Sequence, residues 1–329
     1  MRGGSLVAAL LASLLLCARP DAQPVGGMSA PGQRDPWLWP FAATSPWNTP
    51  IGSAAQFAPA NDPATGDLVT GTAIINAGRW SRPLYLASRD DPVVVVADRE
   101  NKRSFAVRMP PAAKPDPMGD AHLYVVDPSK RRVLEIYGAE RTGDGNFDAL
   151  RAFEVDLYGP GWFLIDGEYP NDVSGTGGLI RSWELKAGSI PHALAFLLPP
   201  WRLKSGPIWP ATHEDYWGFR DYSGHVPFGA LVAIPPGVDV TKLGLTPSGL
   251  ALAQALQDYG AYCIDSSGSD GINLSAEGST EGMTELDDMR ADFGKVHPYL
   301  QLVTNNNAQT PGGGGRPRRG AAPPLTPLP

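Results

Sequence analysis

Histidines and carboxylates recur along the sequence with the side-chain chemistry needed for proton transfer. Imidazole can act as a general acid or base near neutral pH, and a pair of carboxyl groups can hydrolyse a glycosidic bond. The candidate catalytic residues are His122, His192, His213, Glu135, Asp120 and Glu184. We expect His192 and His213 to line one pocket together with His122 and Glu135, because imidazoles beside apolar residues need hydrogen-bonding partners.

A predicted β-hairpin brings some of these side chains together. The loop 128–131 connects two apolar runs, and in register His122 lies opposite Tyr137 and Tyr124 opposite Glu135. Because side chains alternate along a strand, these four project from one face. The other face is predicted to join a core and carries Leu123, Val125, Leu134 and Ile136. The polar face is either a binding cleft or simply exposed to solvent.

Aromatic residues are concentrated between residues 183 and 217, a segment rich in proline. Aromatic rings stack on sugars while their polar tips bind hydroxyls, so this density favours contact with a ligand. The candidate substrate-binding residues are Tyr124, Tyr137, Arg181, Trp183, Trp201, Trp209, Tyr216 and Trp217. Some of these rings are expected in the core instead.

Two alternatives concern the histidines. His192 shares a predicted strand face with Leu194 and Phe196, which equally fits a buried imidazole bonded to the backbone. The three histidines with Asp120 or Glu135 are also possible ligands of a divalent metal. Only Asp120 and His122 are closely spaced, so we predict no cofactor and keep the metal as the alternative.

Short β-type runs separated by Pro, Gly and Asp continue from about residue 69 to residue 303. This spacing is typical of all-β folds. We predict a mainly β protein, an antiparallel β-sandwich or jelly roll (concanavalin-like), with two peripheral helices. The first helix is predicted over 247–259, with Thr246 as N-cap and Gly260 after its end, and the second over 284–294, with Thr284 as cap.

The ends of the chain differ in composition from its body. Residues 1–22 have the pattern of a secretory signal peptide, and no other run is apolar and long enough to span a membrane. We predict a disordered linker over 23–36, a β-sandwich domain over 37–305 and a disordered Pro/Gly-rich tail over 306–329. The expected location is secreted or periplasmic, and Cys263 would be the one cysteine of the mature chain.

Charge and motifs exclude several functions. With 27 Lys and Arg against 34 Asp and Glu, the net charge of -7 argues against nucleic acid or anionic lipid as a partner. The sequence has no GxSxG, HExxH, phosphate-binding loop or dinucleotide-binding fingerprint. We expect a monomer.

Several segments resemble a family of secreted bacterial proteins of unassigned activity. They are SPWNTPIG from Ser45, DAHLYVVDP, VLEIYGAE, GGLIRSWELKAGSIPHALAF, WPATH and LQDYGAYCID, and together they extend over most of residues 41–303. The resemblance implies that Asp120, His122, Glu135, Glu184, His192 and His213 are important. The chain departs from the pattern at Pro191 and in the aromatic insertion after WPATH.

These observations favour an exported enzyme that cleaves a polysaccharide, either as a lyase or as a glycoside hydrolase. A lyase would use His192 or His213 as base, Tyr124 or Tyr216 as acid and Arg181 to neutralise a uronate. A hydrolase would use Glu135 with Asp120 or Glu184. The alternative is a non-catalytic carbohydrate-binding or cell-surface β-module, and in each case the partner is a polysaccharide or oligosaccharide.

Overall fold

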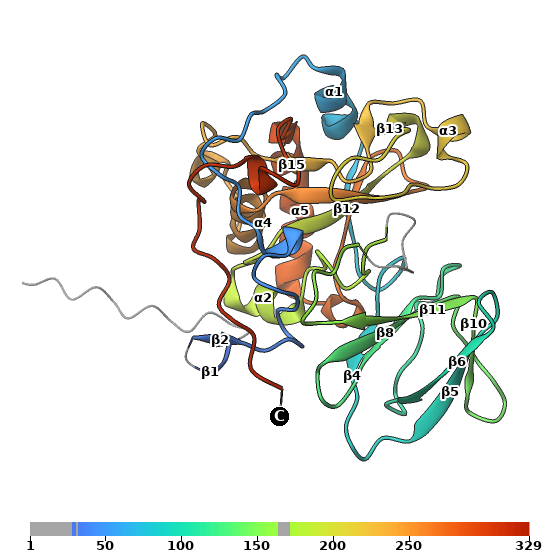
Figure 1. Ribbon diagram of the computed structural model, residues 1–329. Coiled ribbons are helices and arrows are strands. Elements are labelled where there is room, and N and C mark those ends of the chain that lie inside the picture. Colours follow the sequence, from blue (N-terminus) through green and yellow to red (C-terminus); the bar gives the residue numbers. More distant parts are fainter. Residues whose placement is uncertain (1–27, 31, 164–171, 329) are drawn as a thin grey trace, which may run out of the picture.

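A computed structural model describes residues 28–30, 32–163 and 172–328. Most of the strands in this part of the chain form three sheets, two of four strands and one of six (Figure 1). Both parallel and antiparallel strand pairs occur. The predicted signal peptide, residues 1–22, lies outside the described residues.

The six-stranded sheet forms the largest part of the protein. Its order is β18 (Gln301–Leu302), β15 (Leu231–Ala233), β16 (Ala261–Ser266), β12 (Leu194–Leu198), β17 (Ile272–Ser275) and β3 (Ala73–Asn76). The pairs β12 with β16 and β17 with β3 are parallel. Helices α4 (Pro247–Asp258) and α5 (Thr284–Val296) pack against each other and contact β15 and β3, respectively (Figure 1).

Both helices were expected from the sequence. Thr246 is the N-cap of α4, its hydroxyl accepts a hydrogen bond from the Gly249 amide at 3.1 Å, and Pro247 occupies the first helical position. Gly260 follows the end of the helix with φ of 77°, a conformation that glycine adopts without strain. α5 starts at Thr284 as predicted, although its N-cap is Met283 and not Thr284.

The predicted hairpin lies in the first four-stranded sheet, which is ordered β11 (Arg151–Asp156), β8 (Arg132–Tyr137), β7 (Leu123–Val126) and β4 (Leu84–Leu86). Tyr124 lies opposite Glu135, and the Asp127 amide donates to the Arg132 carbonyl at 2.9 Å. The register predicted from the alternation of side chains is therefore confirmed.

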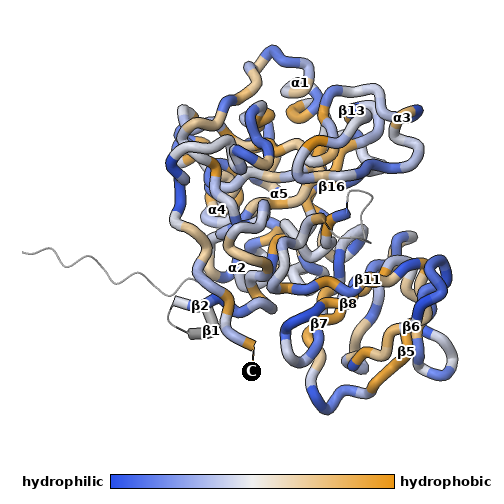
Figure 2. The backbone as a smooth tube through the Cα atoms, viewed as in Figure 1, coloured by the Kyte–Doolittle hydropathy of each residue, from blue (hydrophilic) through white to orange (hydrophobic). Residues whose placement is uncertain are grey.

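The second four-stranded sheet is ordered β6 (Arg103–Arg108), β5 (Val93–Asp98), β10 (Phe147–Ala149) and β9 (Glu140–Arg141). A separate hydrophobic core joins it to the hairpin sheet, to which it contributes Val94, Val96 and Phe147. Figure 2 shows hydrophobic stretches along β5, β7 and β8. The opposing residues of the hairpin sheet are those predicted from the alternation, namely Leu123, Val125, Leu134 and Ile136.

The hairpin sheet is thus the middle of three layers. One face packs on the smaller core, and the other contributes Tyr124, Val126 and Val133 to the larger core with the six-stranded sheet. The remaining elements are short: β1 (Met28–Ala30), β2 (Gln33–Arg34), α1 (Pro63–Val69), α2 (Ser182–Ala187), β13 (Leu203–Lys204), α3 (Gly218–Asp221) and β14 (Val226–Pro227).

The predicted antiparallel β-sandwich or jelly roll needs correction. The strands are not purely antiparallel, because β4 with β7 and β10 with β5 are parallel as well. The two strands of each parallel pair are separated by a long stretch of chain. The alternation of side chains within a strand therefore does not predict that they pair. What holds is the coarser prediction, a β-rich fold with a few helices.

The C-terminal segment was expected to be disordered but lies against the body of the protein. Arg319 Nε is 2.6 Å from Asp258 Oδ2, and Leu325 forms a β-bridge with Arg34. Arg34, from the predicted linker, is buried, and its guanidinium donates to the carbonyls of Pro323, Trp39, Pro40 and Phe41. Hydrogen bonds of the backbone and of arginine side chains thus fix both the predicted linker and the C-terminal tail. Such contacts cannot be inferred from amino-acid composition.

Candidate functional site

Glu135 lies on the predicted hairpin face but is buried beneath a glycine-rich loop. Its carboxylate accepts hydrogen bonds from the Ser174 hydroxyl, the Gly175 amide at 3.0 Å and both the amide and the hydroxyl of Thr176. Gly178 ends this loop with φ of 67°, and a Cβ there would lie 2.3 Å from the Ala195 amide nitrogen. Glu135 therefore anchors a loop and does not face a substrate cleft. Tyr124, opposite it, is fully buried in the larger core.

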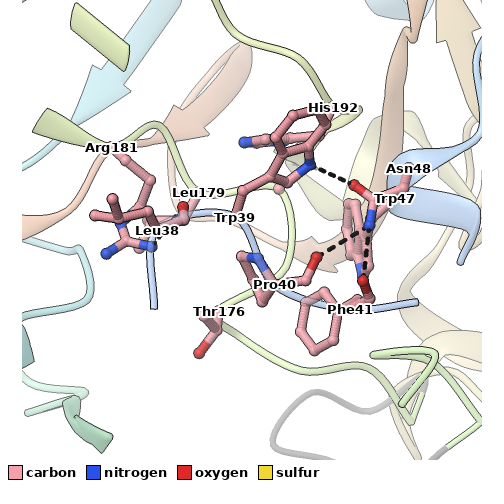
Figure 3. A pocket seen from close by; sticks show the side chains of 11 residues that line it. Leu38, Trp39, Pro40, Phe41, Trp47, Asn48, Thr176, Leu179, Arg181 and His192 are labelled. Carbon is pink, nitrogen blue, oxygen red and sulfur yellow. Dashed lines mark hydrogen bonds between the residues drawn. The ribbon is translucent and has the colours of Figure 1, made fainter. Parts of the chain in front are cut away.

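His192 and Glu184 form a buried pair. The Nε2 atom of His192 lies 2.8 Å from Glu184 Oε1, and its Nδ1 atom lies 2.8 Å from the Ala193 carbonyl oxygen. Figure 3 shows His192 beside Trp39, and the cavity at this place has a volume of about 10 Å³, space for about one water molecule. With both ring nitrogens engaged by acceptors, His192 has no free nitrogen to act as a general base. This geometry favours a structural role for His192 and Glu184 over the catalytic role predicted from the sequence.

The desolvation of His192 by burial lowers its pKa, but the charge of Glu184 and the hydrogen bonds to Glu184 and Ala193 outweigh this effect. The pKa of His192 is therefore raised above its ordinary value. The raised pKa favours the imidazolium form, which carries an N–H on each ring nitrogen. This pair stabilises the turn between α2 and β12.

Arg181 and Trp183, predicted to bind substrate, also have structural roles. Arg181 is buried, with Nε 2.5 Å from Glu277 Oε2, and donates to the Trp37 carbonyl at 2.8 Å. Trp183 donates from its indole nitrogen to the Leu38 carbonyl at 2.9 Å. Both side chains thus hold the segment around residue 38 against α2.

His213 is exposed and lies outside the cavities that contain His122. Its Nδ1 atom is 2.6 Å from Asp172 Oδ2, and 70% of its side chain is accessible to solvent. Trp201 and Trp209 likewise line neither of those cavities among the described residues. Among the described residues, the cavities that contain His122 are lined by neither His192, His213 nor Glu135, so the expected common pocket is not found in this part of the chain.

Asp120 and His122 do lie in a large cleft. It consists of two adjoining cavities of about 530 and 500 Å³ that share Asp120, His122, Asp265 and Ser266. The cleft lies where the end of β16 in the six-stranded sheet meets the start of β7 in the hairpin sheet. Two hydrophobic cores thus position its two walls.

The shared part of the cleft carries an imidazole and two carboxyl groups. His122 Nε2 lies 3.8 Å from Asp120 Oδ2. Desolvation raises the pKa of Asp265 well above its ordinary value, and the charges of Asp215 and Asp120 add to this while Arg82 opposes it. These surroundings therefore favour the protonated form of Asp265, whereas the Asp120 side chain is 45% exposed. This is the contrast between two carboxyl groups that acid catalysis needs.

A third carboxyl group, that of Asp215, supports this arrangement. Asp215 is buried and accepts a hydrogen bond from the Tyr222 hydroxyl. Desolvation raises the pKa of Asp215, and the hydrogen bond from Tyr222 partly offsets the rise. The charge of Asp215 is the largest contribution to the raised pKa of Asp265 after desolvation.

Tyr137 also faces the cleft. Its ring centroid lies 5.7 Å from that of His122, so these two ends of the hairpin share a face as predicted. Desolvation raises the pKa of Tyr137, and the charge of Asp120 raises it further. Tyr137 is therefore a hydrogen-bond donor at neutral pH.

Exposed aromatic rings surround the cleft. Tyr216 and Trp217 lie on one side, with 90% and 48% of their surfaces exposed, and Trp80 lies on the other at 47%. Trp80 has φ of 55°, and Ala121, between Asp120 and His122, has φ of 42°. A non-glycine residue in this conformation costs about 1 kcal/mol or more, and such strain occurs often at functional sites.

Sequence reasoning missed Asp265, Asp215, Arg82 and Trp80. Asp265 ends the run AYCID, in which a carboxylate follows a buried strand, and Asp215 lies within the aromatic insertion that the sequence analysis singled out. Both signals are weak alone. Arg82 and Trp80 lie in an irregular segment with no local pattern.

Within the described residues, no group of three or more His, Cys, Asp or Glu side chains is arranged to hold a metal ion. No helix in this part of the chain combines the length and apolar character that crossing a bilayer requires.

Comparisons with protein-family models, curated proteins and solved structures found no match.

Proposed function

We propose that the protein is a glycoside hydrolase that acts in the cleft between the six-stranded sheet and the hairpin sheet. The observation that carries this proposal is the contrast between Asp265, whose raised pKa favours the protonated form, and the more exposed Asp120 beside it. Glycosidic hydrolysis commonly uses one carboxylic acid and one carboxylate at the scissile bond.

In this proposal each residue has a defined role. Asp265 protonates the glycosidic oxygen as the general acid, and Asp120 acts as the carboxylate that activates water or stabilises the positive charge developing on the sugar ring. His122, 3.8 Å from Asp120, positions that carboxylate. The aromatic rings at the rim bind the faces of sugar rings.

The charges of the cleft favour a neutral glycan over a polyuronate. Asp120, Asp215, Asp265 and Glu214 line it, whereas its basic lining residues are Arg82 and Arg151. Arg151 is already bound to Glu100, with Nε 2.5 Å from Oε2. An anionic chain would meet repulsion from the carboxylates.

The test is a screen of the purified protein against neutral and uronate polysaccharides, with new reducing ends as the readout. We expect hydrolysis of a neutral glycan, and a loss of about 100-fold or more in kcat for Asp265→Asn and Asp120→Asn, the scale typical of a lost acid or base. Glu154→Gln, on an exposed residue of β11 bound to Arg132, is the matched control and should retain activity. Full activity in both aspartate variants would refute the proposal.

A lyase is the second candidate, because His122 and Tyr137 face each other in the same cleft. These residues would then supply the base and the acid. Absorbance from unsaturated uronates, lost in Tyr137→Phe, would identify this reaction. Binding without either product would instead indicate a carbohydrate-binding module, and in every case we take the protein to be exported after removal of residues 1–22.

A further inference from the structure

The two cavities of the cleft share Asp120 and Asp265 and differ in their other lining residues, apart from His122 and Ser266. One cavity continues past Trp80 and Asn273, and the other past Tyr137 and Trp217. A ligand that fills both must therefore pass over the two carboxyl groups. Each volume, about 500 Å³, is in the range of sites for small organic molecules, so each side can hold at least one sugar unit.

The cavity beside Trp80 is lined by neutral hydrogen-bonding groups. Ser267, Ser269 and Ser275 contribute hydroxyls, and Asn76 and Asn273 contribute amides. Such a lining matches the hydroxyl groups of a neutral sugar. It offers little to an anion, because the basic Arg82 is accompanied there by the carboxylate of Asp120.

Asn273 is a lining residue of this cavity that has an unsatisfied hydrogen-bond acceptor. The residue is only 4% exposed, and its Nδ2 atom donates to the Ser269 hydroxyl at 2.8 Å. Its Oδ1 atom is buried and accepts no hydrogen bond from any described residue. A buried carbonyl oxygen without a donor is costly, so Asn273 brings an unused hydrogen-bond acceptor to the wall of this cavity.

Trp80 supplies the surface on which a sugar ring can stack. Its indole contacts Gly119, whose ideal Cβ position lies 3.8 Å from the ring atom Cη2, so the ring lies next to the segment that carries Asp120. It is held there by a left-handed backbone conformation that tryptophan rarely adopts, and nearly half of its surface remains exposed. The exposed part of the ring is therefore accessible to a ligand in this cavity.

We propose that the cavity of Trp80 and Asn273 is a binding subsite for a neutral sugar unit on one side of the scissile bond. Tyr137 and Trp217 bind the units on the other side. This inference rests on the proposed function and deepens it: the substrate is a neutral chain that crosses the cleft, and the protein cleaves internal linkages.

The first test compares two exposed tryptophans. Trp80→Ala should raise KM for the hydrolysed glycan about tenfold, a usual effect of losing one well-buried contact, with little change in kcat. Trp80→Tyr should restore most of the affinity because the stacking surface returns. Trp201→Ala is the matched control, since Trp201 is 54% exposed but lines neither cavity, and it should leave KM unchanged.

The second test concerns Asn273 and chain length. Asn273→Leu, close in size but without the acceptor, should weaken the binding of a hexasaccharide of the same glycan to the Asp265→Asn protein by about tenfold in calorimetry. Thermal unfolding of the same samples verifies that the variant is folded. The unsubstituted enzyme should cleave long chains internally, which lowers viscosity before monosaccharide accumulates.

The outcomes separate the two proposals. If the glycan is hydrolysed and Asp265→Asn is inactive, but Trp80→Ala and folded Asn273→Leu bind and cleave as well as the parent proteins, the subsite is wrong and the proposed function stands. Release of monosaccharide from a chain end as the first product would overturn the internal cleavage. If no glycan is hydrolysed, the proposed function fails. Binding of a neutral oligosaccharide from the screened panel that is lost in Trp80→Ala would then still support the cavity as a sugar-binding site.

Discussion

His192 and Glu184 are joined by a contact of 2.8 Å between Nε2 and Oε1, and the second ring nitrogen of His192 lies 2.8 Å from the Ala193 carbonyl oxygen. Both residues are buried. The pair connects the first turn of α2 with the residues that precede β12. A side chain that the sequence marks as a candidate base is therefore part of the support for the fold.

His192→Gln should lower the free energy of unfolding by about 3 kcal/mol, because it leaves the Glu184 carboxylate buried without a cationic partner. The pKa of His192 is raised in the folded protein, so its stabilisation is complete below the unfolded-state pKa of about 6.5 and is lost as the pH rises through the folded-state value. Denaturant unfolding should therefore show a larger difference at pH 5 than at pH 8. His225→Gln, on an exposed histidine bound to Asp67, should change little. A fall in turnover without a fall in stability would instead identify His192 as catalytic.

Glu135→Gln should destabilise the protein by about 2 kcal/mol, since one carboxylate oxygen facing the hydroxyls and amides of Ser174, Gly175 and Thr176 becomes an NH₂ group that cannot accept. The loss should appear in thermal unfolding, while the kcat of folded protein stays within about threefold, below the scale of a lost catalytic group. Glu154→Gln, on an exposed side chain, provides the comparison. An unchanged melting temperature would show that the loop does not depend on this carboxylate.

Asp265→Asn should gain stability relative to the unsubstituted protein as the pH rises. The folded-state pKa of Asp265 is raised, so ionisation above the unfolded-state value of about 4 is disfavoured by folding, and asparagine does not ionise. Unfolding at pH 4 and pH 8 measures the change. Asp270→Asn is a control of opposite sign, because the hydrogen bond from Thr72 lowers the pKa of the exposed Asp270. The same stability difference at both pH values would mean that Asp265 titrates normally.

Removal of residues 306–329 should lower the melting temperature by several degrees. The truncated chain lacks the Pro323 carbonyl that accepts from Arg34 and the guanidinium of Arg319 that lies 2.6 Å from Asp258. Burial already lowers the pKa of Arg34 to about 10, so the loss of a partner in this place is costly. Removal of residues 327–329 alone should have little effect. A truncation at 305 that melts like the full chain would contradict a structural role for the tail.

Calorimetry should give a single cooperative transition despite the two cores. The hairpin sheet contributes Val126 and Val133 to the larger core and Val125 and Leu134 to the smaller one, so neither core can be lost without exposing the other. Ile136→Ala, in the smaller core, should therefore lower one transition by about 3 kcal/mol rather than separate two. Two resolved transitions would refute the coupling of the layers.

Local patterns were sufficient for the hairpin and the two long helices. Alternation places Leu123 and Ile136 on one face, the four-residue loop fixes the register, and Thr246 with Pro247 starts α4. These features depend on interactions between residues close in sequence. The same local reasoning failed for the tail, where composition indicated disorder and Arg34 and Asp258 instead fix the chain through contacts with residues far along it.

The tertiary structure decided which polar side chains meet. Alternation assigns His122 and Glu135 to the same face, but it does not tell what covers each end of that face. The loop 174–176 buries Glu135, whereas the end of β16 leaves the His122 end open and brings Asp265 beside Asp120. Periodicity indicates the direction of a side chain. Its exposure and pKa depend on segments that are distant in sequence, about 40 residues away for Glu135 and more than a hundred for Asp120. Only packing of the sheets brings those segments together.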